Sequence, residues 1–270
     1  MQAAWHCRKS GIPAEAAAAF ITGYDGQLRR RLQPREVADA VARAYDTRPR
    51  EIYRTAPHLP VVPPWNADET ARLHHELRAT TRDLTALSAD HDPKSYHPHS
   101  LLERLFPDPD GLVCIGESAY RFKTARLRDH KRYREKQFIV PAYMTAEYGK
   151  TAAGKRSMHT KENTGPPRYI VCDFDEPPPE QQPSIILHLM DFRKPAIVLS
   201  SGGKSLHAWF PVTDDPPGDR LFWTLCIALG ADPALHRNPS QFVRLPNGTR
   251  DNGKRQSLLY FAPSSLTTLP

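Results

Sequence analysis

The sequence has few cysteines, and no two of them lie close together. The four are Cys7, Cys114, Cys172 and Cys226, and none belongs to a Cys-x-x-Cys pair. Cysteine-rich zinc modules are built on such pairs, so we expect no structural zinc. Cys172 and Cys226 lie in apolar runs, and we interpret them as buried free thiols.

Long hydrophobic runs are also missing. No apolar run approaches the roughly 18 residues of a membrane-spanning helix, and no signal peptide is visible. We therefore expect no membrane partner and a cytoplasmic location. A P-loop of the form Gly-x-x-x-x-Gly-Lys-Ser/Thr does not occur either. The segment "SGGKS" is too short for one and precedes a predicted strand rather than a helix.

Positive charge and proline are abundant instead. The net charge is +7 and the isoelectric point is near 9.3, which favours a polyanionic partner. Proline accounts for 27 of the 270 residues, about twice its usual share of about 5%. Such a proline content indicates many short elements with rigid connections.

Three segments follow one another along the chain. Residues 1–55 contain two helical patterns, "IPAEAAAAFI" and "QPREVADAVARAYD", with "GQLRRRL" between them. We interpret them as a small helical accessory domain, whose arginines either face solvent or contact nucleic acid. Residues 56–99 read as a proline-rich linker followed by a polar helix over roughly 67–88. The third segment is residues 100–270.

Short apolar runs alternate with two helical patterns in this third segment. After residue 168 the predicted order is strand, helix, strand, strand, helix, strand, with the helices near 184–192 and 219–229. This order indicates an α+β fold with a ferredoxin-like (RRM-like) βαββαβ sheet. The segment "SSGG" (200–203) is the predicted tight turn between the two middle strands.

Two stretches of this unit carry groups suited to chemistry. The first predicted strand ends in "DFD", which places the carboxylates of Asp173 and Asp175 on the same side. A surface turn or a helix cap is the alternative interpretation. In "SSGGKSLHAWF" the glycines allow the backbone to approach an anion, while Lys204 adds charge and His207 begins the next strand. A plain hairpin turn is the alternative there.

A third stretch, "LGADPALHRNPSQFVRLPNGTRDNGKRQ" (229–256), adds one more carboxylate and several cations. Asp232 follows an apolar helix, and Arg244, Arg250, Lys254 and Arg255 flank a turn. If the three stretches converge on one face of the sheet, their carboxylates suit Mg²⁺ or Mn²⁺. Two such ions about 3.5–4 Å apart organise in-line phosphoryl transfer.

These stretches resemble the three motifs of the archaeo-eukaryotic primase superfamily, in its phage- and plasmid-type primase-polymerases. "DFD", "SGGKSLHAW" and a downstream Asp are similar to Asp-h-Asp/Glu, Ser-Gly-x-x-x-x-His and h-Asp, where h is hydrophobic. The spacing is 34 residues from Asp173 to His207 and 25 from His207 to Asp232. The resemblance covers about residues 100–262. The third motif departs from the pattern because a small alanine precedes Asp232, and Asp251 competes with Asp232 for that place.

The resemblance implies a DNA primase or primase-polymerase that replicates phage, plasmid or other mobile DNA. Residues 100–270 would be its catalytic domain, using nucleoside triphosphates, a single-stranded DNA template and a separate helicase. Two Mg²⁺ or Mn²⁺ ions would be held by the catalytic carboxylates of Asp173, Asp175 and Asp232. The nucleotide would be held by Ser201, Gly202, Lys204, His207 and Arg244.

A basic segment agrees with a nucleic-acid partner. Residues 121–168 contain 13 Lys or Arg against 4 Asp or Glu, and several aromatic residues lie in or beside them. Phosphate contacts combined with base stacking are the usual means of holding single strands, although a solvated basic face is the alternative. The residues that we expect to bind the template are Arg132, Lys136, Lys155, Arg156 and Arg250.

Two other functions remain open at this point. One is a non-catalytic replication module that binds single-stranded DNA, and the other is a metal-dependent nuclease. Asp173, Asp175 and His207 together favour catalysis, because a binding module has no need of carboxylates beside its phosphate partner.

Overall fold

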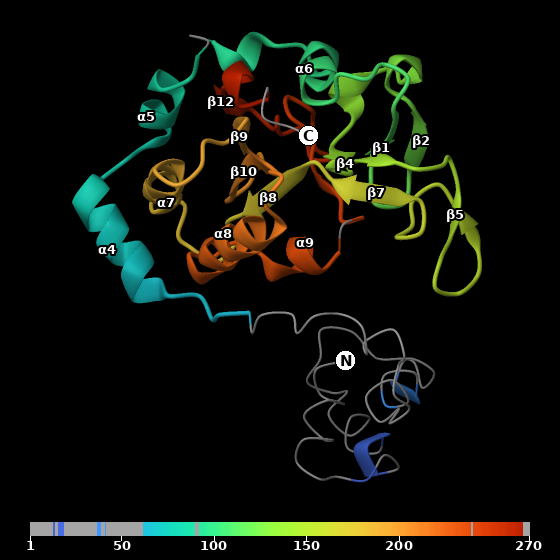
Figure 1. Cartoon of the computed structure of the whole chain (residues 1–270), viewed down its shortest axis with the longest axis horizontal. Helices are drawn as coiled ribbons and strands as arrows, with labels where there is room; N and C mark the ends of the chain where they lie inside the picture. The colour runs from blue at the N-terminus through green and yellow to red at the C-terminus, as the bar shows by residue number, and fades with distance from the viewer. Residues whose placement is uncertain are drawn as a thin grey trace. The chain divides into compact units, whose positions relative to one another are not determined.

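A computed structural model describes residues 13, 16–18, 37, 38, 41, 62–89, 92–238 and 240–266 of the chain. The chain divides into two compact units, residues 1–59 and residues 60–270. Almost all of the predicted helical accessory domain lies outside the described residues. The account below therefore concerns the second unit (Figure 1).

A four-stranded antiparallel sheet forms the centre of this unit. Its strands are β8 (Tyr169–Asp173), β9 (Ile197–Ser200), β10 (Leu206–Pro211) and β12 (Leu258–Phe261). Helix α7 (Gln182–Met190) follows β8, and helix α8 (Pro216–Ala228) follows β10. The predicted order of strands and helices after residue 168 is therefore confirmed, apart from the short elements α9 (Pro233–Arg237) and β11 (Val243–Arg244) that come before β12.

The spatial order of these strands differs from the ferredoxin-like arrangement that we predicted. The sheet order is β12-β9-β10-β8, whereas a ferredoxin-like sheet places its last strand beside its first. Here β12 pairs with β9 through Leu258 and Leu199. The outer edge of β8 is occupied near its end by the loop before α9, where the N–H of Asp232 donates to the carbonyl of Asp173 at 2.9 Å. The α+β class holds, and the ferredoxin-like topology is not formed.

A second antiparallel sheet of six strands curls into a half-barrel. Its order is β11-β3-β1-β4-β7, and β2 pairs with β1. A separate hairpin, β5–β6, projects from this side of the unit (Figure 1). The bounds are β1 (Leu112–Gly116), β2 (Phe122–Arg126), β3 (Phe138–Ile139), β4 (Ala142–Met144), β5 (Gly149–Lys150), β6 (Arg156–Ser157) and β7 (Thr164–Pro167).

The polar helix predicted over 67–88 is two helices, α4 (Ala67–Leu77) and α5 (Thr81–Ala86). The first ends because Arg78 adopts a left-handed conformation with φ of 49°. The second begins at a capping box in which Thr80 and Asp83 satisfy each other's backbone N–H groups. Both helices pack against α7, so this segment belongs to the core of the unit.

One more helix and several 3₁₀ turns complete the described part of this unit. Helix α6 (Pro98–Leu105) comes before β1 and contributes three fully buried leucines. The 3₁₀ turns are η3 (Pro93–Ser95), η4 (Leu127–Asp129), η5 (Tyr133–Glu135) and η6 (Pro263–Leu266).

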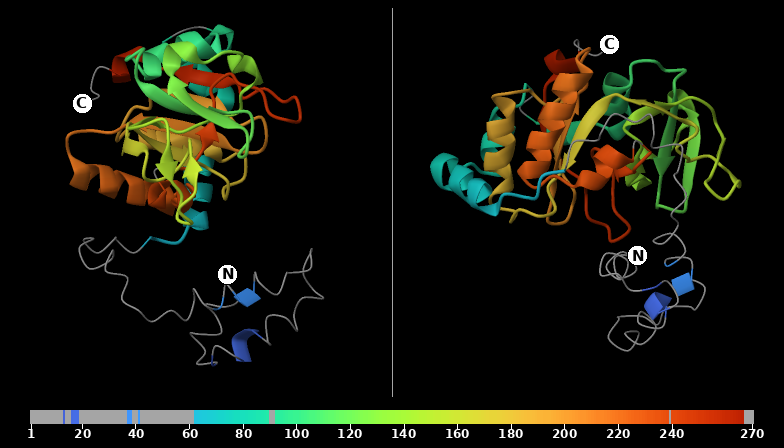
Figure 2. Two further views of the ribbon diagram at one scale, coloured as in Figure 1. Left: turned by 90° about the vertical axis from the view of Figure 1, so that its right-hand side faces the viewer. Right: turned by 60° about the horizontal axis from the view of Figure 1, so that its bottom comes forward.

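Two hydrophobic cores lie on opposite faces of the four-stranded sheet. Helices α4, α5, α7 and α8 cover one face, where Ile170, Cys172 and Phe174 are buried. The half-barrel sheet and α6 cover the other face, against Tyr169 and Val171 (Figure 2). Because side chains alternate along a strand, Asp173 belongs to the face that looks toward the half-barrel sheet.

The cysteines and the lengths of the helices bear on two further expectations, buried free thiols and no membrane-spanning helix. Cys114, Cys172 and Cys226 are buried free thiols, as expected for the last two. Within the described ranges, the helices are too short or too polar to cross a lipid bilayer.

Candidate active site

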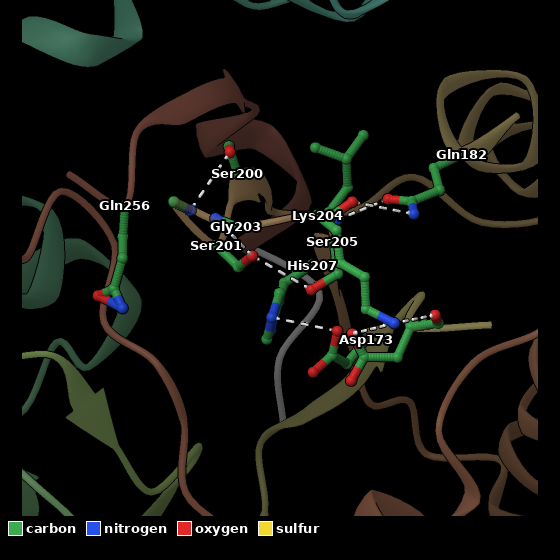
Figure 3. Close-up of polar contacts among 12 residues, drawn as sticks. Asp173, Gln182, Ser200, Ser201, Gly203, Lys204, Ser205, His207 and Gln256 are labelled. Carbon is green, nitrogen blue, oxygen red and sulfur yellow. Dashed lines mark hydrogen bonds and ion pairs between the residues drawn. The ribbon is translucent and has the colours of Figure 1, made fainter. Parts of the chain in front are cut away.

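Asp173 and His207 face each other directly across two neighbouring strands. They are register partners at the ends of β8 and β10, and His207 Nε2 lies 3.3 Å from Asp173 Oδ1. Both ring nitrogens of His207 and the Oδ1 atom of Asp173 are buried, without a well-aligned hydrogen bond to any described residue. Figure 3 shows the pair beside the turn between β9 and β10. The sheet register has therefore brought together residues 34 positions apart.

Burial changes the protonation of this pair. Burial, followed by the charge of Arg244, lowers the pKa of His207 to about 3. Burial, followed by the charge of Asp175, raises the pKa of Asp173 to about 7, and Asp232 acts in the same direction. At neutral pH the imidazole is uncharged and the Asp173 carboxyl is close to half-protonated. The pair is therefore not an ordinary salt bridge.

This protonation predicts how stability depends on pH. The folded protein keeps the Asp173 proton up to about pH 7, whereas an unfolded chain releases it near pH 4. The contribution of Asp173 to stability therefore falls as pH rises through that window. The variant Asp173→Asn carries no such charge, so we expect its melting temperature to exceed that of the wild type increasingly from pH 4 to 7. The matching difference in the free energy of unfolding should reach a few kcal/mol near pH 7 and then level off.

Calorimetry in the presence of a chelator measures this difference. The contribution of His207 to stability has the opposite pH dependence: it is fully present above about pH 6.5 and is lost as pH falls. The wild type and Asp173→Asn both contain His207, so this contribution cancels in the comparison. The exposed Asp214 provides the control, because Asp214→Asn should follow the wild-type curve. Parallel curves for Asp173→Asn and the wild type would contradict the assigned environment of Asp173.

The other two predicted carboxylates lie close to Asp173. Asp175 is two residues beyond it, with 51% of its side chain exposed. Asp232 is joined to Asp173 by the backbone hydrogen bond described above, and its side chain caps α9 by accepting from the N–H of Ala234 at 2.8 Å. Asp251 lies instead in an exposed turn, where its charge acts on Arg244. Within the described ranges, no group of three His, Cys, Asp or Glu side chains is close enough to hold a metal ion.

The turn between β9 and β10 contains a serine hydroxyl, two glycines and a lysine. Gly202 has φ of 72°, and a Cβ atom there would lie 2.9 Å from the carbonyl oxygen of Arg255. The Ser201 hydroxyl accepts from the N–H of Gly203 at 3.3 Å. Lys204 Nζ donates to the carbonyl oxygen of Asp175 at 2.8 Å. The predicted nucleotide-binding turn therefore contacts the predicted metal-binding loop.

Two arginines of the third stretch lie near the site, since the charges of both act on His207. Arg244 lies on β11 of the half-barrel sheet, half-buried over the ring of Phe138 at 4.7 Å, and its pKa is lowered by burial and then by the charge of Arg250. Arg250 was expected on the template surface, but its Nη1 would be 2.9 Å from a Cβ atom at Gly203. Arg250 therefore lies against the turn between β9 and β10.

The remaining predicted template residues lie in two places. Arg132 and Lys136 line a basic pocket of about 370 Å³; Arg132 is exposed, while Lys136 is half-buried and pairs with Glu117 at 2.7 Å. The basic pocket also contains two exposed lysines that we did not single out, Lys123 and Lys131. Lys155 and Arg156 belong to the β5–β6 hairpin instead, where the Arg156 guanidinium lies 3.7 Å from the ring centre of Tyr148.

Residues without a sequence signal also support the site. Gly230, two residues before Asp232, has φ of 95°, and a Cβ atom there would lie 2.4 Å from Pro177 and 3.3 Å from Trp65. Gln182 is fully buried and bonds to both the Asp175 loop and the nucleotide-binding turn. A glutamine at a helix start and a glycine two residues before an aspartate are common, so no pattern identifies them.

Comparison of the chain with protein-family models, with curated proteins and with solved structures gave no match.

Proposed function

We propose that the protein is a template-directed nucleotidyltransferase, a DNA primase or primase-polymerase that works on single-stranded DNA. The observation that carries the proposal is that Asp173 faces His207 across two strands, with Asp232 bonded to Asp173 and Lys204 bonded to Asp175. Carboxylates beside a lysine and a glycine turn favour a phosphoryl-transfer site over a surface turn without catalytic function. The proposal does not require a ferredoxin-like sheet: the site is built on the strand order β12-β9-β10-β8.

The chemistry of the carboxylates suits divalent cations, although among the described residues they do not converge into a metal site. Asp173 Oδ1 is a buried oxygen that lacks a hydrogen-bond donor among the described residues, and the charges of Asp175 and Asp232 oppose its ionisation. Hard cations prefer such oxygen ligands. Asp173, Asp175 and Asp232 would hold two Mg²⁺ or Mn²⁺ ions, which supply stabilisation of the charge that develops in phosphoryl transfer.

The remaining groups of the site would bind and orient the nucleotide. Lys204 and Arg250 provide positive charge beside the turn, and the backbone of Gly202 and Gly203 allows phosphate oxygens to approach closely. His207 is neutral and lies beside Asp173, so it would donate a hydrogen bond rather than a charge. Arg244 reaches the same region from the half-barrel sheet.

We place the single-stranded template along the basic pocket. The carbonyl of Lys136, which lines the pocket, accepts from the N–H of Thr249 at 3.1 Å. Arg250 follows Thr249 and lies at the nucleotide-binding turn. The pocket and the turn are therefore joined through one short stretch of backbone. We infer that a strand held at the pocket reaches the nucleotide along this stretch.

Charge reversal in the basic pocket tests this path. Lys123→Glu with Lys131→Glu should weaken single-stranded DNA binding and lower the log–log salt slope by about 1.4, since each lost phosphate contact accounts for about 0.7. We choose these residues rather than Lys136, because reversing Lys136 would also break its pair with Glu117. A salt titration by fluorescence anisotropy measures both effects.

Two exposed cations elsewhere on the same unit provide the control. Lys194→Glu with Arg220→Glu changes the net charge by the same amount outside the basic pocket, and it should leave the salt slope unchanged. Equal losses in both double variants would mean that the template is held by general charge rather than by the basic pocket.

Incorporation of labelled nucleotides on a single-stranded DNA template, with Mg²⁺ and with Mn²⁺, tests the proposed function. A binding module would hold the template without incorporation, and a nuclease would shorten it. Either result would replace the proposal. Comparing ribonucleotides with deoxynucleotides in the same assay then identifies the product.

A further inference from the structure

Gln182 joins two loops that the proposed function assigns to different ligands. It is the first residue of α7 and is fully buried. Its amide nitrogen donates to the carbonyl of Pro177 at 2.9 Å and to the carbonyl of Lys204 at 3.2 Å. Its amide oxygen accepts from the N–H of Leu206 at 2.7 Å. Figure 3 shows the side chain reaching toward Lys204. Both N–H donors of the Gln182 amide, and its oxygen, are therefore bonded to backbone groups of these two loops.

The two loops carry the opposite ends of the site. Pro177 is two residues beyond Asp175, in the loop that would hold metal. Lys204 and Leu206 lie within three residues before His207, in the segment that would hold phosphate. A change in the Gln182 amide therefore acts on both loops at once.

A second link between the loops is exposed. Lys204 Nζ donates to the carbonyl of Asp175 and lies 3.8 Å from its Oδ1 atom, with the two side chains 66% and 51% exposed. If Lys204 binds a nucleotide phosphate, its ammonium turns away from Asp175 and this link weakens. Gln182 is buried and has no such competing partner, so its bonds persist when the nucleotide binds.

We propose that Gln182 is a positioning residue that holds the Asp175 loop and the Lys204 turn in register. The inference rests on the proposed function, since it concerns how the same site brings metal and nucleotide together. Neither ligand touches Gln182. Its effect appears in the coupling between the two ligands, the factor by which one raises the affinity for the other.

The coupling can be measured without catalysis. Calorimetric titration of a non-hydrolysable deoxynucleoside triphosphate, with and without Mn²⁺, gives the factor for the wild type, which we expect to be at least about tenfold. Gln182→Glu keeps the acceptor for Leu206 and loses donation to the two carbonyls. The buried carboxylate would face two carbonyl oxygens and should destabilise the protein; the favourable place of an acidic residue at a helix start offsets part of this cost, and calorimetry shows whether the variant is folded. We expect each ligand alone to bind within about threefold of the wild type, and the coupling factor to fall at least about tenfold.

Asn163 offers a matched control. It is also a buried amide that accepts from a backbone N–H, of Thr160, and donates to two carbonyls, of Ala146 and Met158. Its partners belong to neither loop of the site. Asn163→Asp should therefore keep the wild-type coupling factor while being destabilised in a similar way.

The outcomes separate the inference from the proposed function. Wild-type coupling in Gln182→Glu, or an equal loss in Asn163→Asp, would overturn the inference and leave the proposed function standing. A wild-type protein that binds neither Mn²⁺ nor the triphosphate would overturn both. Gln182→Met, of similar length and uncharged, repeats the test without a carboxylate and should give the same loss of coupling.

Discussion

Replacing Asp175 with asparagine is expected to lower nucleotide incorporation about a thousandfold or more. The carboxylate would hold a metal ion, and removing such a group takes away electrostatic stabilisation where charge develops. The side chain is half exposed, so the substitution leaves no buried group unpaired and the melting temperature should change little. Primer extension on a single-stranded template, with calorimetry in parallel, measures both quantities. Normal incorporation would remove Asp175 from the site.

Neighbouring carboxylates provide controls for this experiment. Glu176 is exposed and follows Asp175 directly, so Glu176→Gln should retain activity. Asp232→Asn should lose activity like Asp175→Asn, while asparagine keeps the cap of α9. Asp251→Asn, in the exposed turn, should stay active. The reverse result for Asp232 and Asp251 would make Asp251 the third carboxylate.

His207→Ala should weaken triphosphate binding about 10- to 100-fold, the value of one hydrogen bond to a charged group. His207 is neutral and buried, so its loss removes a donor without removing a charge. Mn²⁺ binding should be retained, because the ring only lies beside Asp173 at 3.3 Å. Calorimetric titrations with each ligand alone separate the two effects. A large loss of Mn²⁺ affinity would show that His207 is itself a metal ligand.

The local features of the site follow from short patterns in the sequence. The alternation in "YIVCDFD" places Asp173 on one face of β8, and "SSGG" forms the turn that the glycines allow. The order of strands and helices after residue 168 was predicted correctly as well. These features depend on residues within a few positions of one another, where periodicity and turn chemistry act directly.

The neighbours of each element could not be predicted in the same way. The strand β12 pairs with β9 and not with β8. Which sheet edge is free for a last strand depends on where the other segments pack, and a local pattern does not contain that information. The position of Arg250 against Gly203 results from how residues 247–256 fold back. Both outcomes depend on contacts between segments tens of residues apart.

The sequence by itself determined the chemistry available to this protein: the paired carboxylates, the glycine turn with its lysine and histidine, and the excess of positive charge. The tertiary structure alone decided which of these groups meet. It paired His207 with Asp173 through the sheet register, and it placed the amide of Gln182 against two loops on either side of it in the sequence. The reason is physical, since a buried amide takes whichever backbone groups the packing leaves unsatisfied, and those partners are defined only once the whole unit has folded.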